Sequence, residues 1–219
     1  MKSFQPIVAS ITISLRIHDE VINGQQHWPW TKRTLDLLIS SLALILALPL
    51  IGVIAILIKL QSKGAALYAQ ERIGKGGRPF TMYKLRSMYL DAEKNGPALA
   101  TAHDERITPL GRTLRKWRLD ELPQLWNVMK GDMSLVGPRP ERKFYVDRIA
   151  ERAPNYARLH KLKPGLTSLG IVNYGYASSI NEMIDRQRHD QYYFENQSLR
   201  LDLSILARSV GVVLGKKGK

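Results

Sequence analysis

The sequence predicts an α+β, helix-rich fold: a single compact domain with a small β-hairpin and one re-entrant membrane helix bent at a proline. Three observations support this prediction. A long apolar run covers residues 35–60, a hairpin pattern covers 67–89, and several helical patterns follow between 110 and 214. A chain of 219 residues suits one domain with an appendage.

The apolar run LDLLISSLALILALPLIGVIAILIKL (35–60) is charged only near its ends, at Asp36 and Lys59. As a straight helix it would be roughly 39 Å long, more than a hydrocarbon core of about 30 Å. It lies too far into the chain for a signal peptide, is too long, and lacks a small-residue cleavage site. A buried core helix is the weaker alternative for a run this long and this apolar.

Pro49 stands near the middle of the run, where it removes an N–H group and clashes with the preceding turn, so we expect a bend. Ser40 and Ser41 lie within a turn or two and are candidates to satisfy the freed backbone groups. A spanning helix carries its excess of Lys and Arg on the cytoplasmic side only. Here basic residues flank both ends: Lys32, Arg33, Lys59, Lys63, Arg72 and Lys75. We therefore favour a re-entrant helix over residues 31–62 rather than a span.

The rest of the chain divides into three parts. Residues 1–30 form an amphipathic or partly disordered lead-in, in which Trp28 and Trp30 suit the headgroup layer of a membrane. Residues 63–198 form the main domain. Residues 199–219 form a basic amphipathic tail, whose apolar side either lies in the headgroup layer or packs on the domain.

Within the main domain, turn residues and periodicity predict the order of the elements. We expect a hairpin that turns at 74–77, a loop or short helix over 91–109, two helical patterns in 110–131 broken at 119–123 and stopped at Gly131, a rigid turn over 134–141, and helices over 142–160 and 180–197.

The composition is strongly basic, with 33 Lys and Arg against 19 Asp and Glu and a formal net charge of +14. Such a protein seeks anions: nucleic acid, anionic lipid headgroups or phosphorylated substrates. The apolar run argues against a nucleic-acid-binding protein, because it is costly to keep in water and useless for reading phosphates. The absence of cysteine excludes disulfides, thiolate metal sites and cysteine nucleophiles.

The adjacent carboxylates of Asp120 and Glu121, followed by Leu122 and Pro123, are the most pointed chemical feature. One interpretation is structural, an aspartate that caps a helix with proline in its first turn. The other is catalytic, with an aspartate that attacks phosphorus and a neighbouring glutamate that holds a hard cation such as Mg²⁺. The two are compatible, because free N–H groups at a helix N-terminus attract both carboxylates and phosphates.

Attack on a phosphoanhydride needs its charge masked, and arginine suits phosphate oxygens. Arg112, Arg115 and Arg118 precede the carboxylate pair at helical spacing, and Arg139 is held between two prolines. Lys84 and Arg86 in the hairpin are weaker candidates. For any one of these residues a solvated or headgroup-facing position is the alternative. No nucleophile elbow, zinc-binding helix motif or Walker element is present in the sequence.

The stretch RTLRKWRLDELPQLWNVMKGDMSLVGPRPE (112–141) closely resembles the signature of the bacterial sugar transferase family, the monotopic phosphoglycosyl transferases that act on polyprenyl phosphate. The resemblance runs from about residue 30 to the C-terminus, and this chain looks like the stand-alone form. Its further motifs are KRTLD (32–36), ERIGKGGRPFTMYKLRSM (71–88), DERITPLGR (104–112), KPGLTS (163–168) and YYFENQSLRLDLSIL (192–206).

The resemblance implies a mechanism and assigns roles within it. Asp120 would be the nucleophile that displaces UMP from a UDP-sugar and forms an aspartyl phospho-sugar. Glu121 would bind Mg²⁺, and Arg115 and Arg139 would contact phosphate groups. Polyprenyl (undecaprenyl) phosphate would then attack the intermediate, in ping-pong order. A re-entrant helix is also a trait of the family.

The resemblance further implies a setting. The 63–198 domain would be catalytic and lie on the cytoplasmic face of the inner membrane, in contact with anionic headgroups. The reaction would be the first membrane step of glycan assembly, for exopolysaccharide, lipopolysaccharide or capsule. A homo-oligomer stays open, and a catalytically silent membrane scaffold is the alternative function.

The sequence departs from the family pattern at two places. Leu48 stands before Pro49 where small members commonly carry serine, so the bend is satisfied differently. Many members read Gly-Trp-Ala-Gln-Val-Asn-Gly-Arg where this chain has residues 168–175, SLGIVNYG. The arginine is absent, so substrate preference is expected to differ if this segment lines the pocket.

Overall fold

The computed structural model describes residues 29–94, 96–101 and 104–215. Helices dominate and a small antiparallel hairpin accompanies them, so the predicted helix-rich α+β fold is confirmed. The predicted lead-in, with Trp28, lies almost wholly outside the described residues. The elements are, in chain order, α2 (Pro29–Gln61), β1 (Leu67–Ile73), η1 (Lys75–Gly77), β2 (Pro79–Leu85), α3 (Pro109–Lys116), η2 (Leu119–Glu121), α4 (Gln124–Lys130), β3 (Ser134–Val136), α5 (Lys143–Arg152), η3 (Pro154–Lys161), β4 (Gly165–Thr167), α6 (Leu169–Asn173), α7 (Ile180–Glu195) and α8 (Leu199–Leu214).

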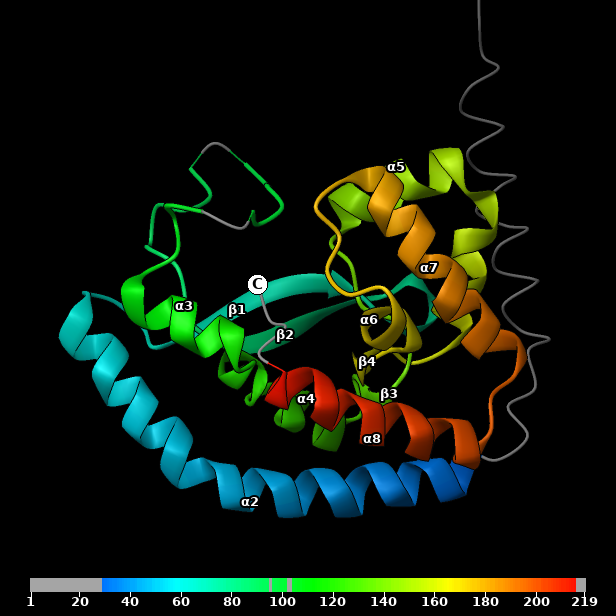
Figure 1. Ribbon diagram of the computed structural model, residues 1–219, viewed down its shortest axis with the longest axis horizontal. Coiled ribbons are helices and arrows are strands. Elements are labelled where there is room, and N and C mark those ends of the chain that lie inside the picture. Colours follow the sequence, from blue (N-terminus) through cyan, green and yellow to red (C-terminus); the bar gives the residue numbers. More distant parts are fainter. Residues whose placement is uncertain (1–28, 95, 102–103, 216–219) are drawn as a thin grey trace, which may run out of the picture.

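Helix α2 continues for 33 residues through Pro49. Figure 1 shows that it bends part-way along, so that the first arm lies beneath the domain and the second arm rises along one side of it, next to α3. It is long and apolar enough to cross a membrane, and only 11% of its most apolar stretch is buried. The hydroxyl of Ser40 donates to the carbonyl of Leu37 in the first arm (3.4 Å), so the expectation that Ser40 serves the bend is wrong.

Polar residues fasten the first arm of α2 to the domain. Arg33 donates to the carbonyl oxygens of Val128 (2.6 Å) and Met129 (2.7 Å), and so satisfies the C-terminal end of α4. Asp36, which is buried, accepts a hydrogen bond from the backbone N–H of Leu135 in β3 (3.0 Å). These contacts explain why charged residues stand at the start of an apolar helix.

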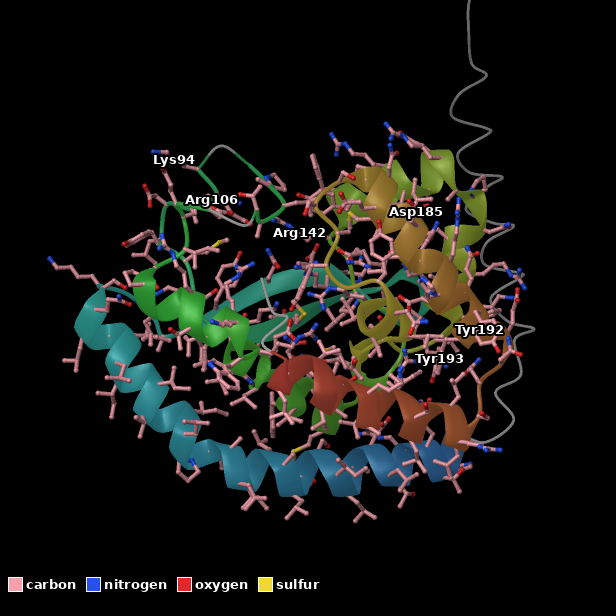
Figure 2. The ribbon with its side chains drawn as sticks, viewed as in Figure 1. Lys94, Arg106, Arg142, Asp185, Tyr192 and Tyr193 are labelled. Carbon is pink, nitrogen blue, oxygen red and sulfur yellow. The ribbon has the colours of Figure 1, made fainter. Side chains whose placement is uncertain are left out.

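Helix α8 lies along the same arm (Figure 1). Lys32 pairs with Asp202 (2.5 Å), and Asp202 also accepts from the hydroxyl of Tyr193 at the end of α7 (2.6 Å), which Figure 2 labels. Ile205 on α8 is fully buried, whereas Leu203 remains half exposed. The tail therefore packs on its own domain through one side and leaves apolar side chains exposed on another.

The second arm of α2 packs through hydrophobic contacts. Ile54 and Ile58 are buried against Leu85 of β2 and Leu114 of α3. Both arms of the helix are therefore attached to the same domain.

The predicted hairpin is confirmed. Strands β1 and β2 are antiparallel, with Tyr68 opposite Lys84. The turn between them places Gly76 and Gly77 at φ 70°, a backbone conformation that favours glycine. The register brings Tyr68 and Lys84 to the same face of the sheet.

The predicted break at 119–123 is also confirmed, because η2 separates α3 from α4. Thr108 caps α3 by accepting from the N–H of Gly111. Gly131 ends α4 with φ 97°, as its position in the sequence predicted.

The segment 134–141 was predicted as a rigid turn, but it begins with strand β3, which pairs in parallel with β4. Gly137 follows β3, and a Cβ atom there would clash with the carbonyl oxygen of Lys163. The two backbones thus approach too closely for a side chain. Because this pairing joins segments about thirty residues apart, local periodicity gave no sign of it.

Candidate active site

Asp120 and Glu121 lie on the 3₁₀ turn η2, and both are buried, at 6% and 7% exposure. The interpretation of Asp120 as a helix cap is wrong. Helix α4 begins at Gln124 with Pro123 at its N-cap, and no side chain in the described part of the protein caps either α4 or η2. Both carboxylates therefore lie on a short turn between two helices, and neither caps a helix.

Three cationic side chains surround Glu121. Its Oε1 lies 3.3 Å from Lys84 Nζ and 3.6 Å from Arg139 Nη2, and its Oε2 lies 3.7 Å from Arg118 Nη1. Burial works to raise the pKa of Glu121, but these three positive charges outweigh it and lower that pKa to about 2. Glu121 is therefore ionised throughout the physiological pH range.

The pKa of Asp120 is shifted the other way. Burial raises it, and the nearby charge of Glu121 raises it further, against the opposing effects of Lys84 and Arg115. Two adjacent carboxylates are thus held with divergent proton affinities, a pattern found where such groups have different chemical roles.

Arg139 is held by the backbone of its Pro-Arg-Pro turn. Its N–H donates to Oδ2 of Asp190 (3.4 Å), and Oδ1 of the same aspartate accepts from the N–H of Gly170 (2.8 Å). Asp190 on α7 therefore joins this turn to α6. Asp190 was not predicted as a site residue, because an aspartate in the middle of a polar helix carries no local signal.

A second group of buried ion pairs lies next to the Pro-Arg-Pro turn. Glu141 pairs with Arg186 on α7 (2.5 Å) and with Arg72 on β1 (3.4 Å). Burial lowers the pKa of Arg72 to about 10, although Glu141 opposes the shift. None of these three residues was predicted as a site residue from the sequence, although Glu141 ends the 112–141 motif.

The other predicted site residues differ in whether they line the cavity that contains Asp120. Arg115 lines the same cavity as Asp120. Arg86 also lines it, but its guanidinium donates to the carbonyls of Ser62 (2.9 Å) and Lys63 (2.7 Å) at the end of α2. Arg112 is exposed on α3 and does not line this cavity.

The cavity has a volume of about 420 Å³. The carboxylate pair lies at its wall together with Lys84 and Arg139, and the segment that follows β2 forms another side. Arg142 crosses to this segment and binds Glu93 through two hydrogen bonds, of 2.6 and 3.1 Å. Figure 2 shows Arg142 between helix α7 and the loop that carries Lys94 and Arg106.

The residues present fit a magnesium ion only with help from the substrate. No group of three or more His, Cys, Asp or Glu able to hold a metal occurs in the described ranges. Mg²⁺ commonly binds one or two carboxylates together with substrate phosphates and water. The contacts of Glu121 at 3.3–3.7 Å are longer than tight charge-assisted hydrogen bonds, so its oxygens keep coordinating capacity.

A buried carboxylate pair among cationic side chains, on a domain attached to a long exposed apolar helix, is the arrangement expected of a membrane-associated protein that binds phosphorylated compounds. A family model described as bacterial sugar transferase matches residues 27–216. The chain belongs to this family, as the motif resemblance implied.

Curated relatives agree with the family. The chain is 41% identical to the UDP-N-acetylgalactosamine-undecaprenyl-phosphate N-acetylgalactosaminephosphotransferase of Aeromonas hydrophila, over 85% of this chain and 44% of the relative. It is 43% identical to the UDP-glucose:undecaprenyl-phosphate glucose-1-phosphate transferase of Caulobacter vibrioides, over 84% of this chain and 69% of the relative. An Escherichia coli protein of the latter name is 35% identical, over 82% of this chain. The chain spans less than half the length of the Aeromonas and Escherichia relatives.

Proposed function

We propose that this protein transfers a sugar 1-phosphate from a UDP-sugar to undecaprenyl phosphate, with an aspartyl phospho-sugar intermediate on Asp120. The observation that carries the proposal is the buried pair Asp120–Glu121 among Lys84, Arg139 and Arg118. The printed names of the relatives describe this class of reaction with different sugars.

The chemistry proceeds in two displacements at one phosphorus. A carboxylate oxygen of Asp120 bonds to the phosphorus that carries the sugar, while the bond from this phosphorus to the oxygen bridging to the nucleotide breaks. UMP leaves with that electron pair. An oxygen of undecaprenyl phosphate then attacks the same phosphorus, and the Asp120 carboxylate leaves.

The surroundings suit a nucleophilic carboxylate. Burial removes water from around Asp120, and the raised pKa makes it more basic than an exposed aspartate. Lys84, Arg115 and Arg139 bring positive charge to the cavity, where it offsets the charge of a diphosphate.

Glu121 would hold Mg²⁺ together with the phosphates of the substrate. The ion would supply further positive charge to the phosphate oxygens. Glu121 suits this role because it stays ionised and is fixed in place by its cationic neighbours.

The attachment of α2 supports a membrane-surface location with the helix entering and leaving on one side. Lys32 and Arg33 in the first arm contact α8 and α4, and Ile58 near the other end packs on the hairpin and α3. A straight span would carry one of these ends about 30 Å away, across the hydrocarbon core. A location of the catalytic domain on the cytoplasmic face of the inner membrane is part of the proposal, and the attachment of α2 supports only that the domain lies on one side.

UMP release tests the proposal directly. Purified protein in lipid nanodiscs with Mg²⁺ and undecaprenyl phosphate should release UMP from one member of a panel of UDP-sugars. Asp120→Asn should lower this release by at least a thousandfold, because an amide is not a comparable nucleophile. No release by folded wild-type protein with any sugar would favour the silent-scaffold alternative instead.

A further inference from the structure

Tyr176 lies between α6 and α7 and lines the cavity. Its ring centroid is 5.0 Å from the guanidinium carbon of Arg118 and 5.2 Å from that of Arg139. Each of these arginines also pairs with one oxygen of Glu121. A cation near an aromatic ring is attracted to its face, more strongly where water is excluded. Arg118 and Arg139 therefore link the ring of Tyr176 to Glu121 of the carboxylate pair.

The conformation of Arg118 is energetically unfavourable in two respects. Within the described residues it is the one non-glycine with positive φ, at 55°. Its side chain is only 9% exposed, and its Nε and Nη2 atoms are buried without a hydrogen-bond partner in the described structure. Left-handed backbone and unpaired buried N–H groups are both unfavourable, and such costs concentrate at functional sites. In this position Arg118 pairs with Glu121 and lies near the ring of Tyr176, and both interactions favour the strained conformation.

The chemistry of Tyr176 differs from that of its neighbours in the cavity. Lys84, Arg115 and Arg139 are cationic and suit phosphate oxygens. Burial raises the pKa of Tyr176 to about 12, and Glu121 adds to the shift, so its hydroxyl stays protonated at neutral pH. A neutral hydroxyl on an aromatic ring suits a sugar, which offers both hydroxyl groups and an apolar C–H face.

We propose that Tyr176 contacts the sugar of the sugar 1-phosphate that Asp120 receives, and that Arg118 is the positioning residue that holds Tyr176 in place. This inference rests on the proposed function.

Two measurements separate this assignment from a contact with the nucleoside. A sugar contact acts on the UDP-sugar but not on UMP, which carries no sugar, whereas a nucleoside contact acts on both. kcat/KM for undecaprenyl phosphate starts from the sugar phosphate already bound to Asp120, so a contact that is equally strong in this intermediate and in the transition state leaves it unchanged. Loss of a sugar contact should therefore lower kcat/KM for the UDP-sugar and leave the inhibition constant of UMP unchanged, whereas loss of a nucleoside contact should alter both.

The test compares Tyr176→Phe with wild type in nanodiscs, with kcat/KM measured for the UDP-sugar and the inhibition constant measured for UMP. We expect kcat/KM to fall by about tenfold, the effect of one lost hydrogen bond, and the inhibition constant of UMP to stay unchanged. The preference between UDP-sugars that differ at one hydroxyl should narrow at the same time. Tyr174→Phe is the matched control, because Tyr174 is exposed and does not line this cavity, and it should match wild type.

A double-mutant cycle tests Arg118. Arg118→Met keeps the bulk of the side chain without its charge, and Arg118→Gly also relieves the backbone strain. If Arg118 acts through Tyr176, each should lower kcat/KM for the UDP-sugar and narrow the sugar preference, and adding Tyr176→Phe to either should cause little further loss. Additive losses would overturn the positioning role.

Three outcomes would overturn the assignment of Tyr176. These are an unchanged kcat/KM for the UDP-sugar in Tyr176→Phe, a weakening of UMP inhibition equal to the fall in kcat/KM, and an unchanged sugar preference. A melting temperature equal to that of wild type excludes general unfolding as the cause of any loss. If wild type itself released no UMP, the proposed function would fail and this inference with it. Wild-type release with an unaffected variant would remove the inference alone.

Discussion

At the residue scale, the reactivity of the site depends on two adjacent carboxylates with opposite pKa shifts. Glu121 is surrounded by Lys84, Arg139 and Arg118, so its pKa falls to about 2. Asp120, its neighbour, has a raised pKa because burial outweighs the attraction of Lys84 and Arg115. The cationic side chains thus keep Glu121 ionised, whereas burial and the charge of Glu121 make Asp120 a stronger base.

The raised pKa of Asp120 predicts its effect on stability. A group whose pKa is raised by folding stabilises the protein below its unfolded-state pKa, and this contribution is lost as pH rises through the folded-state value. At neutral pH the ionised Asp120 is therefore unfavourable. Asp120→Asn should have a melting temperature equal to or above that of wild type, measured by differential scanning fluorimetry. A clear decrease would show that Asp120 makes stabilising contacts when ionised.

The same shift predicts the pH dependence of the reaction. Asp120 must be ionised to attack phosphorus. As the pH is lowered, kcat/KM for the UDP-sugar should therefore decrease, with an apparent pKa above the ordinary 3.8 of aspartate. Lys84→Gln removes a positive charge that lowers this pKa, so the acid limb should move to higher pH.

Lys143→Gln is the control for this shift, because Lys143 is exposed and pairs with Asp147 on the surface of α5. Its acid limb should coincide with that of wild type. An identical limb in Lys84→Gln would contradict the proposed coupling to Asp120.

At the scale of elements, Arg86 was predicted as a phosphate ligand, but its guanidinium binds the segment that directly follows helix α2. Its guanidinium donates to the carbonyls of Ser62 and Lys63 and to the hydroxyl of Ser62, all between 2.7 and 2.9 Å. Ser62 and Lys63 directly follow α2, so Arg86 fixes the chain at the point where the helix ends. Arg86 therefore couples the end of the membrane helix to strand β2.

Removal of the hydrogen bonds from Arg86 to Ser62 and Lys63 should reduce stability. Arg86→Gln should lower the free energy of unfolding by about 2 kcal/mol, because hydrogen bonds to a charged donor are lost. Chemical denaturation in detergent measures this. Arg112→Gln, on the exposed face of α3, should stay within about 0.5 kcal/mol of wild type. A large rise in KM with unchanged stability in Arg86→Gln would instead restore the phosphate-binding interpretation.

At the scale of the whole molecule, the bent helix α2 and the domain form one unit. Both arms are fastened to the domain, the first by polar contacts and the second by apolar ones (Figure 1). Exposed leucine, isoleucine and valine side chains remain along the helix, among them Leu38, Leu46, Val53 and Leu60. The domain is therefore expected to lie on the membrane surface, with the active site held at a set height by α2.

Cysteine labelling tests this arrangement, and the natural sequence contains no cysteine to interfere. Trp30→Cys and Lys63→Cys should both react with a membrane-impermeant maleimide from the cytoplasmic side only. Lys143→Cys marks the side on which the domain lies. Labelling of the two helix ends from opposite sides would show that α2 spans the membrane.

Much of the fold was predictable because its signals are local. The apolar run with Pro49, the turn at 74–77 and the stop at Gly131 each depend on a few neighbouring residues, and each is found as an element or an end. The strand pair β3–β4 was missed, because parallel pairing depends on a distant partner. The capping interpretation of Asp120 was wrong because η2 inserts a separate turn before α4.

The sequence by itself determined the class of the protein: an apolar helix with basic flanks, a basic domain, and the carboxylate pair Asp120–Glu121 within a specific motif. Only the tertiary structure decided the surroundings of that pair. Lys84 comes from the hairpin, Arg139 from the turn after β3, and Tyr176 from the segment after α6. The physical reason is that pKa shifts and binding geometry depend on distance in space, and these residues are far apart in the chain.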